Sequence, residues 1–255
     1  MIFTVRSLAT VFAAPVMLAA CSASPTDPAP VATETALADS GEKPDLLLFT
    51  SLPIYWSEGG LGDMLSADAP VHWARTALEA RYDLVPVDTL TSLPANGTLL
   101  MAQPRALSAE ENVALDDHVR GGGRVVLIVD PMLDAHSAYG LGDRRRPEAI
   151  SMLSPILARW GLRLVPDGRE AYEAQWGSRT FAVEEGGRFE LASGGHDSVC
   201  HLVDDALIAR CNVGNGKVML LGDATFLAHG ENAGADGAGL LADLIAAAET
   251  PPSAP

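Results

Sequence analysis

The middle of the chain reads Ser108-Ala-Glu-Glu-Asn-Val-Ala-Leu-Asp-Asp-His-Val-Arg-Gly-Gly-Gly-Arg-Val-Val-Leu-Ile-Val-Asp-Pro131. Glu111 follows Ser108 by three residues, which is the capping-box pattern that begins a helix. The three glycines at 121–123 predict the end of that helix, because glycine readily adopts the left-handed backbone of a C-cap. The apolar run at 124–130 is typical of a strand covered on both faces of a parallel sheet. A helix followed at once by a buried strand predicts an α/β fold.

The same alternation extends through residues 45–249. We expect further strands at 45–50, 84–87, 98–102, 162–165 and 217–223, and further helices at 71–82 and 154–160. Ser154 and Pro155 are expected to be the N-cap and first turn of the latter helix. Pro86 lies in the second strand, which favours a position near a sheet edge. A last helix is indicated by apolar residues at helical spacing, namely Leu240, Leu241, Leu244, Ile245 and Ala248. This order predicts a doubly wound, mostly parallel α/β sheet.

Residues 178–213 differ from the rest and predict an antiparallel insertion of two β-hairpins. The first pairs 180–183 with 188–191, and the second pairs 198–203 with 207–212. In the second hairpin Cys200 and Cys211 are equally far from the turn at Asp205 and Ala206, so they face each other across the strands. In an oxidising compartment this predicts a disulfide, and two free, half-buried thiols are the alternative.

The N-terminus has the layout of an export signal, with one arginine, Arg6, before a short apolar run. This run is too short to span a membrane. It ends on Leu18-Ala-Ala-Cys21, which resembles the lipobox of bacterial lipoproteins. The resemblance implies cleavage of residues 1–20 and lipid attachment to Cys21, and Ser22 favours the outer membrane. The alternative is an ordinary signal peptide with a chance cysteine. Residues 21–44 read as a disordered tether and 250–255 as a disordered tail.

The composition restricts the partners. The 255 residues contain 33 acidic side chains against 17 Lys and Arg, a formal net charge of −16. Nucleic acid is not expected, because its binding requires clustered positive charge. Anionic headgroups also repel an acidic domain, so the lipid is expected to hold the protein at the membrane, facing the periplasm. Three cysteines are too few for a disulfide-dense scaffold.

Candidate ligand-binding residues follow from the rule that open α/β sheets bind ligands at the carboxyl ends of their strands. Six residues there are expected to form one crevice for a small polar ligand: Trp56, Glu58, Arg105, Asp130, Asp223 and Thr225. The alternative for Asp130 and Asp223 is that they cap loops or helices. No cofactor and no metal is expected; His229 with Glu231 and the two aspartates is a weaker metal hypothesis.

Three segments, 99–112, 115–131 and 216–227, resemble the extracytoplasmic domain of gliding-motility-type ABC transporter auxiliary components. The resemblance implies a flavodoxin-like or class I glutamine amidotransferase-like sheet without the catalytic cysteine. It also implies a non-enzymatic module that binds a ligand or a transporter permease. Members of that group are typically tethered by transmembrane helices, whereas this chain has a lipobox. Two other functions stay open: an envelope hydrolase that uses Asp130 and Asp223 with Arg105, and a purely structural envelope protein.

Overall fold

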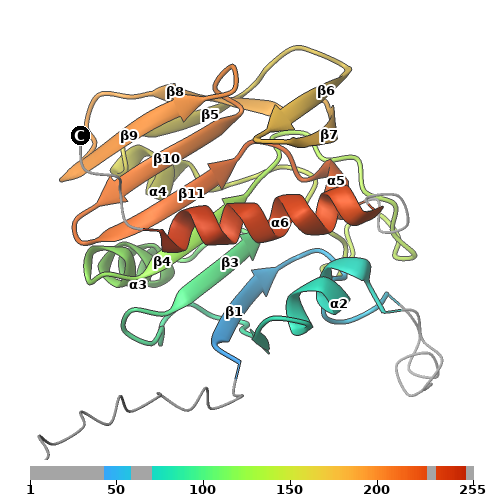
Figure 1. Cartoon of the computed structure of the whole chain (residues 1–255), viewed down its shortest axis with the longest axis horizontal. Coiled ribbons are helices and arrows are strands. Elements are labelled where there is room, and N and C mark those ends of the chain that lie inside the picture. The colour runs from blue at the N-terminus through green and yellow to red at the C-terminus, as the bar shows by residue number, and fades with distance from the viewer. Residues whose placement is uncertain (1–42, 59–70, 229–233, 251–255) are drawn as a thin grey trace, which may run out of the picture. The chain divides into compact units, whose positions relative to one another are not determined.

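The computed structural model describes residues 43–58, 71–228 and 234–250 (Figure 1). Strands and helices alternate in its first half: β1 (Asp45–Thr50), α2 (Trp73–Glu79), β2 (Asp83–Pro86), β3 (Thr98–Ala102), α3 (Ala109–Arg120), β4 (Arg124–Ile128) and α4 (Ser154–Arg159). Six strands follow: β5 (Leu162–Pro166), β6 (Ala171–Trp176), β7 (Arg179–Glu184), β8 (Gly187–Leu191), β9 (Ser198–Val203) and β10 (Ile208–Val213). The last described elements are β11 (Gly216–Leu221), α5 (Thr225–Ala228) and α6 (Gly234–Glu249).

The main sheet has seven strands in the order β2-β1-β3-β4-β11-β10-β9. The five strands from β2 to β11 are parallel, whereas β10 and β9 are antiparallel to their neighbours. The chain places β2 on one side of β1 and β3 on the other, so the topological switch point lies between β1 and β3. The predicted doubly wound α/β fold is confirmed, as is the edge position of the proline-containing strand β2.

Helices cover both faces of this sheet (Figure 1). α2 and α6 pack on one face, and the five apolar residues that predicted α6 are all buried there. α3 and α4 pack on the other face, where Leu115 and Trp160 are buried against the sheet. Burial on both faces explains the continuous apolar runs of the central strands, since each side chain of β3 is buried.

The start of α3 agrees with the prediction from the sequence, whereas the start of α4 does not. Ser108 and Glu111 form the predicted capping box, each side chain accepting a backbone N–H of the other residue. The expected N-cap Ser154 is wrong, because the cap position of α4 is Leu153, without a side-chain hydrogen bond. Pro155 lies in the first turn as expected, where its missing N–H is not needed.

The first predicted hairpin is wrong. β7 pairs with β6, and β8 pairs with β5, in two separate two-stranded sheets. Phe181 of β7 is buried in the core on the α6 face, whereas Phe189 of β8 is buried in the core on the α4 face. The two segments therefore lie on opposite faces of the main sheet and cannot pair. Residues 162–165 lie in β5, which pairs with β8 and not with the strands of the main sheet.

The second predicted hairpin is confirmed, with Cys200 opposite Cys211 in the register of β9 and β10. The two residues form a disulfide. The hairpin does not stand apart as an insertion, however. β10 pairs with β11, so the hairpin extends the main sheet by two strands.

Candidate functional site

Gln103 organises the carboxyl edge of the parallel strands. It follows β3, is fully buried and has a φ of 40°, a backbone conformation that is uncommon for residues other than glycine. Its side-chain amide donates to the carbonyl oxygens of Asp130 and Glu148, at 3.1 and 2.8 Å, and accepts from the Asp130 N–H at 2.8 Å. One buried side chain thus joins the ends of β3 and β4 to the loop that follows β4.

Ser51, after β1, holds the same loop from the other side. Its hydroxyl donates to the carbonyl oxygen of Gln103 and accepts the backbone N–H of Glu148 at 2.9 Å. Thr50 donates to the carbonyl oxygen of Ala102 at 2.7 Å. These bonds fix the strand ends at the switch point, where the fold rule places ligands.

A cavity of about 380 Å³ opens at this switch point. Residues after β1, β2 and β3 and from the loop after β4 line it: Phe49, Thr50, Ser51, Val87, Asp88, Arg105, Ala106, Arg144 and Glu148. The volume lies within the range of small-molecule pockets. Arg144 is exposed and makes no hydrogen bond or ion pair with the described residues, although two carboxylates, Asp88 and Glu148, line the same cavity.

Arg105, the second cation of the cavity, is held rigidly. Its guanidinium donates to both carboxylate oxygens of Glu111, each at 2.8 Å, and to the backbone oxygens of Asp88 and Ala106. It also lies over the Phe49 ring, 4.9 Å from the ring centre. The hydrogen bonds from Arg105 lower the pKa of Glu111 to about 2. Arg105 is therefore a positioned cation, with most of its donors already used.

The two strand-end aspartates form a separate, closed pair. Asp130 and Asp223 are both fully buried, and neither lines the switch-point cavity. Asp130 accepts the N–H groups of Met132 and Ala224, at 2.7 and 3.4 Å. Asp223 accepts the N–H and hydroxyl of Thr225, at 3.1 and 3.0 Å. Both side chains thus bond to N–H groups of the loops in which they lie, the arrangement of loop-capping residues.

Burial governs the protonation of this pair. Desolvation raises the pKa of Asp130 to about 6. Desolvation and, secondarily, the charge of Asp130 raise the pKa of Asp223 well above its usual value. A buried carboxyl favours its neutral form because water no longer solvates the charge.

The sequence matches the family model described as an ABC-type uncharacterized transport system over residues 45–191. The chain belongs to this family. It is an auxiliary component of an ABC-type transport system. No curated protein matches the sequence.

Solved structures resemble the auxiliary component in fold. The mmIFT52 N-terminal domain aligns with a TM-score of 0.50 and 11% identity, over 84% of this chain and 100% of that domain. Cytoplasmic protein STM1381 from Salmonella typhimurium LT2 aligns with a TM-score of 0.44 and 12% identity, over 80% and 99% of the two chains. The exo-β-1,4-mannosidase Op5Man5 from Opitutaceae bacterium strain TAV5 aligns with a TM-score of 0.45 and 13% identity, over 81% of this chain. The auxiliary component spans only 36% of that mannosidase. At these identities the likeness concerns the fold alone.

The six residues expected in one crevice are not gathered into one. Arg105 lines the switch-point cavity, whereas Asp130, Asp223 and Thr225 are buried beside α5. Glu58 accepts hydrogen bonds from the Ser137 hydroxyl and the Ala138 N–H, at 2.8 and 2.6 Å. Trp56 is 63% exposed and makes an edge contact with Tyr55. The structure does not bring the six side chains into one crevice, because the two aspartates are buried in hydrogen bonds to loop N–H groups and Glu58 is bonded to Ser137 and Ala138.

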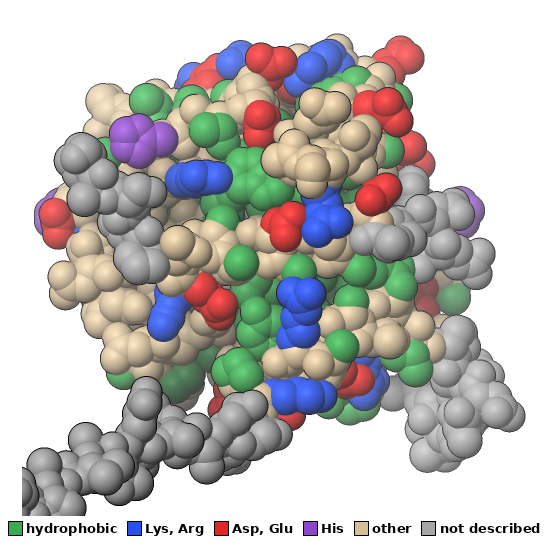
Figure 2. Space-filling model, in the orientation of Figure 1, with side chains coloured by type: hydrophobic (Ala, Val, Ile, Leu, Met, Phe, Trp, Pro, Cys, Tyr) green, Lys and Arg blue, Asp and Glu red, His purple; other side chains and the backbone are tan. Residues whose placement is uncertain are grey.

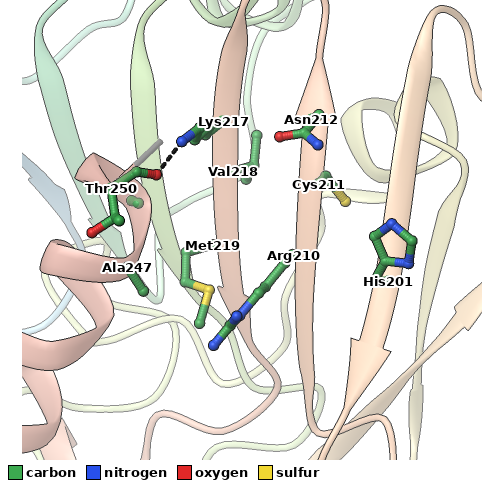
Figure 3. Close-up of a pocket in the computed structure, with 10 residues that line it drawn as sticks. His201, Arg210, Cys211, Asn212, Lys217, Val218, Met219, Ala247 and Thr250 are labelled. Carbon is green, nitrogen blue, oxygen red and sulfur yellow. Dashed lines mark hydrogen bonds between the residues drawn. The ribbon is translucent and has the colours of Figure 1, made fainter. Parts of the chain in front are cut away.

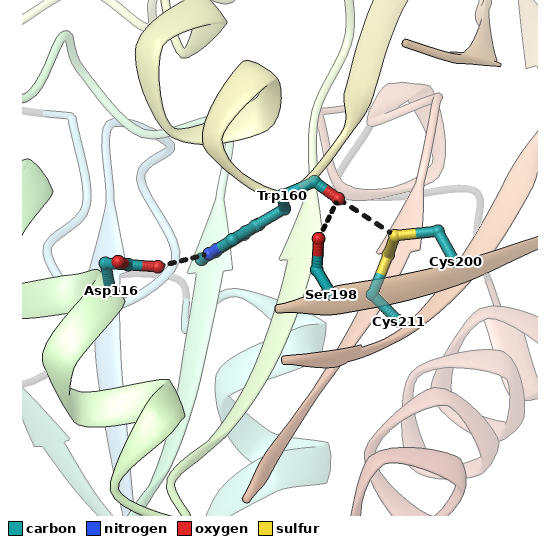
Figure 4. The surroundings of a disulfide bond; sticks show 5 residues. All are labelled: Asp116, Trp160, Ser198, Cys200 and Cys211. Carbon is teal, nitrogen blue, oxygen red and sulfur yellow. Dashed lines mark hydrogen bonds between the residues drawn. A yellow bond between two sulfur atoms is a disulfide. The ribbon is translucent and has the colours of Figure 1, made fainter. Parts of the chain in front are cut away.

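The surroundings of the disulfide are tightly bonded in this auxiliary component (Figure 4). The Ser198 hydroxyl donates to the Trp160 carbonyl oxygen at 2.9 Å, and the Cys200 sulfur lies 3.4 Å from the same oxygen. The Trp160 ring N–H donates to Asp116 at 3.0 Å, and two arginines also donate to that carboxylate. The disulfide joins β9 to β10, and the Ser198 hydrogen bond joins this hairpin to Trp160 at the end of α4.

Other predicted residues lie beyond what the structure describes. Cys21, the tether up to residue 42, His229, Glu231 and the tail from 251 fall outside the described residues. Within residues 43–58, 71–228 and 234–250, no group of three or more His, Cys, Asp or Glu side chains could hold a metal ion. No helix in these same ranges is long and apolar enough to cross a membrane.

Gln103, Ser51 and Arg144 are not among the six residues that were expected to bind a ligand. Gln103 carries one available signal, since it is the polar residue directly after a wholly apolar strand. Arg144 belongs to a run of three arginines, which by itself is typical of a solvated loop. Its position in the cavity depends on the fold of the 131–150 loop, and no local pattern encodes that.

Proposed function

We propose that this auxiliary component is a lipid-anchored envelope protein that binds a small polar ligand or a transporter permease at the switch-point cavity without catalysing a reaction. The supporting observation is the cavity itself. It joins the carboxyl ends of three parallel strands, contains one locked and one unpaired arginine, and holds no residue arranged as a nucleophile with a base.

The buried aspartates support a binding role over hydrolysis. A hydrolase using Asp130 and Asp223 would need both carboxyl groups in contact with substrate, and both are 0% exposed. Their oxygens accept hydrogen bonds from the loops that they cap. We therefore do not propose the hydrolase alternative.

The envelope location is supported by two independent features. The lipobox-like Leu18-Ala-Ala-Cys21 is the sequence feature. The Cys200–Cys211 disulfide is the structural one, because such bonds persist in oxidising compartments. The anchor keeps the acidic domain near a membrane that its own charge would repel.

Two measurements test this proposal. The first fractionates cells that express the full chain or its Cys21→Ser variant. We expect the variant to move from membranes to the soluble periplasmic extract, and a Cys200→Ser variant to stay with the membranes. Membrane retention of Cys21→Ser, or wild-type protein in the cytosol, would overturn the anchor.

The second measurement is co-purification from detergent-solubilised membranes. We expect an ABC permease to be recovered with the wild-type chain and to be lost with Arg144→Glu, while the exposed Arg81→Glu leaves recovery unchanged. If no permease is recovered, small polar metabolites that co-purify are identified by mass spectrometry. Absence of both, or equal recovery with Arg144→Glu, contradicts binding at the cavity.

A further inference from the structure

A second cavity, distinct from the switch point, lies on the open part of the sheet beside the end of α6. Its volume is about 510 Å³. The lining comes from four elements, β9, β10, β11 and α6: His201, Arg210, Cys211, Asn212, Lys217, Val218, Met219, Ala247, Ala248 and the adjoining Thr250. α6 packs on β4 and β11 and leaves β9 and β10 uncovered on this face (Figure 3).

The charge of this cavity is opposite to that of the protein. The chain has a net charge of −16, yet no carboxylate lines this cavity. Nine other arginines are ion-paired with carboxylates among the described residues. Arg210 has no such partner; its guanidinium lies over the Trp176 ring, 4.6 Å from the ring centre. The positive charge of Arg210 therefore has no carboxylate partner among the described residues, although the molecule is strongly acidic.

The register of the sheet gathers further basic groups at this place. Lys217 of β11 is directly opposite Arg124 of β4, and Arg210 of β10 is directly opposite His201 of β9. Lys217 and Arg124 carry like charges on directly opposed residues, which destabilises a sheet. The charge of Arg124 and, more strongly, burial lower the pKa of Lys217. An anion bound at Lys217 would relieve that repulsion.

The cavity also has an apolar side. Met219 and Ala248, both buried in the core on the α6 face, line it, and Figure 3 shows Arg210 extending from β10 toward Met219. On the face shown in Figure 2, blue Lys and Arg side chains lie next to green hydrophobic ones. A charged group and a short hydrocarbon portion can therefore be accommodated together.

We propose that this cavity binds a small soluble organic phosphate. The Arg210 fork suits phosphate oxygens, and the Asn212 amide can donate a further hydrogen bond. Lys217, whose amine donates to the Thr250 carbonyl oxygen, adds a second positive charge to the same lining. The volume matches a small molecule, and the net charge of the whole protein disfavours an anionic membrane as the source of the phosphate.

Calorimetric titration of the full chain with hexyl phosphate tests this proposal. We expect saturable binding that weakens at least tenfold in Arg210→Gln and in Lys217→Gln, with Arg210→Lys intermediate because it keeps the charge and loses the fork. Hexanol should not bind, and inorganic phosphate should bind more weakly than hexyl phosphate. Ligand addition should change tryptophan fluorescence in the wild type and not in Trp176→Phe.

The matched control is Arg81→Gln, which removes an exposed arginine that lines neither cavity. It should leave hexyl phosphate binding unchanged. Absence of saturable binding, or equal affinity in folded Arg210→Gln protein, would overturn the proposal, as would loss of binding in Arg81→Gln. Sedimentation with phosphatidylglycerol vesicles that depends on Arg210 would overturn the assignment to a soluble ligand.

Discussion

The carboxyl edge of β1, β3 and β4 and the open face of β9–β11 use polar side chains in opposite ways. At the carboxyl edge Gln103 and Asp130, together with Asp223 after the neighbouring strand β11, are fully buried. Their side chains form hydrogen bonds mainly with backbone groups. On the open face Arg210 is exposed and has no carboxylate partner. A polar group satisfied inside the protein positions the chain, whereas an exposed charge without a partner is available to a ligand. The comparison shows that polar residues at strand ends need not form a binding site.

The largest effect is expected from Gln103→Ala. The substitution removes three buried hydrogen bonds and leaves the Asp130 N–H and two carbonyl groups without partners. We expect the free energy of unfolding to fall by about 3 kcal/mol. Urea denaturation measures this value, and the exposed Gln175→Ala is the control, which should stay within about 0.5 kcal/mol of the wild type. A loss below about 1 kcal/mol for Gln103→Ala would remove the contrast between the two regions.

A pH-dependent effect of similar size is expected from the buried aspartates. Asp130 holds its proton in the folded state up to about pH 6, whereas the unfolded chain releases it near the ordinary value of 3.8. Stability from this group is therefore complete below about pH 3.8 and is lost as the pH rises through 6, by about 3 kcal/mol. Asp130→Asn should remove the part of the pH-dependent loss of stability that Asp130 causes. Thermal unfolding between pH 4 and pH 7.5 measures it, and an unchanged slope in the variant would contradict the assignment.

The smallest effects come from two arginines, one in each region. Arg105→Gln leaves the carboxylate of Glu111, whose side chain is 5% exposed, without its ion pair, and should cost about 1–2 kcal/mol. Arg210→Gln should change the free energy of unfolding by less than about 0.5 kcal/mol. Urea denaturation of both variants at pH 7 makes the comparison. If Arg210→Gln costs as much as Arg105→Gln, the guanidinium on Trp176 stabilises the fold and is not reserved for a ligand.

Part of the structure was accessible from the sequence because its signals are local. The capping box at Ser108, the glycines at 121–123 and the apolar strand after them are formed by neighbouring residues. The Cys200–Cys211 pairing is similar, since a tight hairpin fixes which residues face each other. These elements determine a doubly wound α/β chain with a cross-strand disulfide.

The candidate site was predicted less well. Chain order placed Arg105, Asp130 and Asp223 after parallel strands, and the structure puts all three at that edge. Chain order alone does not show which of these side chains turn inward and cap their own loops. That outcome depends on the space left by the 131–150 loop, which Gln103 and Ser51 hold in place through contacts far apart in the sequence.

The sequence by itself determined the chain order of the main-sheet strands and of α2, α3, α4 and α6, the acidic balance and the cysteine pairing, because short-range periodicity and composition encode them. Only the tertiary structure decided that β7 and β8 lie on opposite faces of the sheet, and that Lys217 and Arg210 share one open cavity. Both depend on which segments, far apart in the sequence, bury their apolar side chains against the same face of the sheet. This burial depends on the whole fold, and no local sequence pattern encodes it.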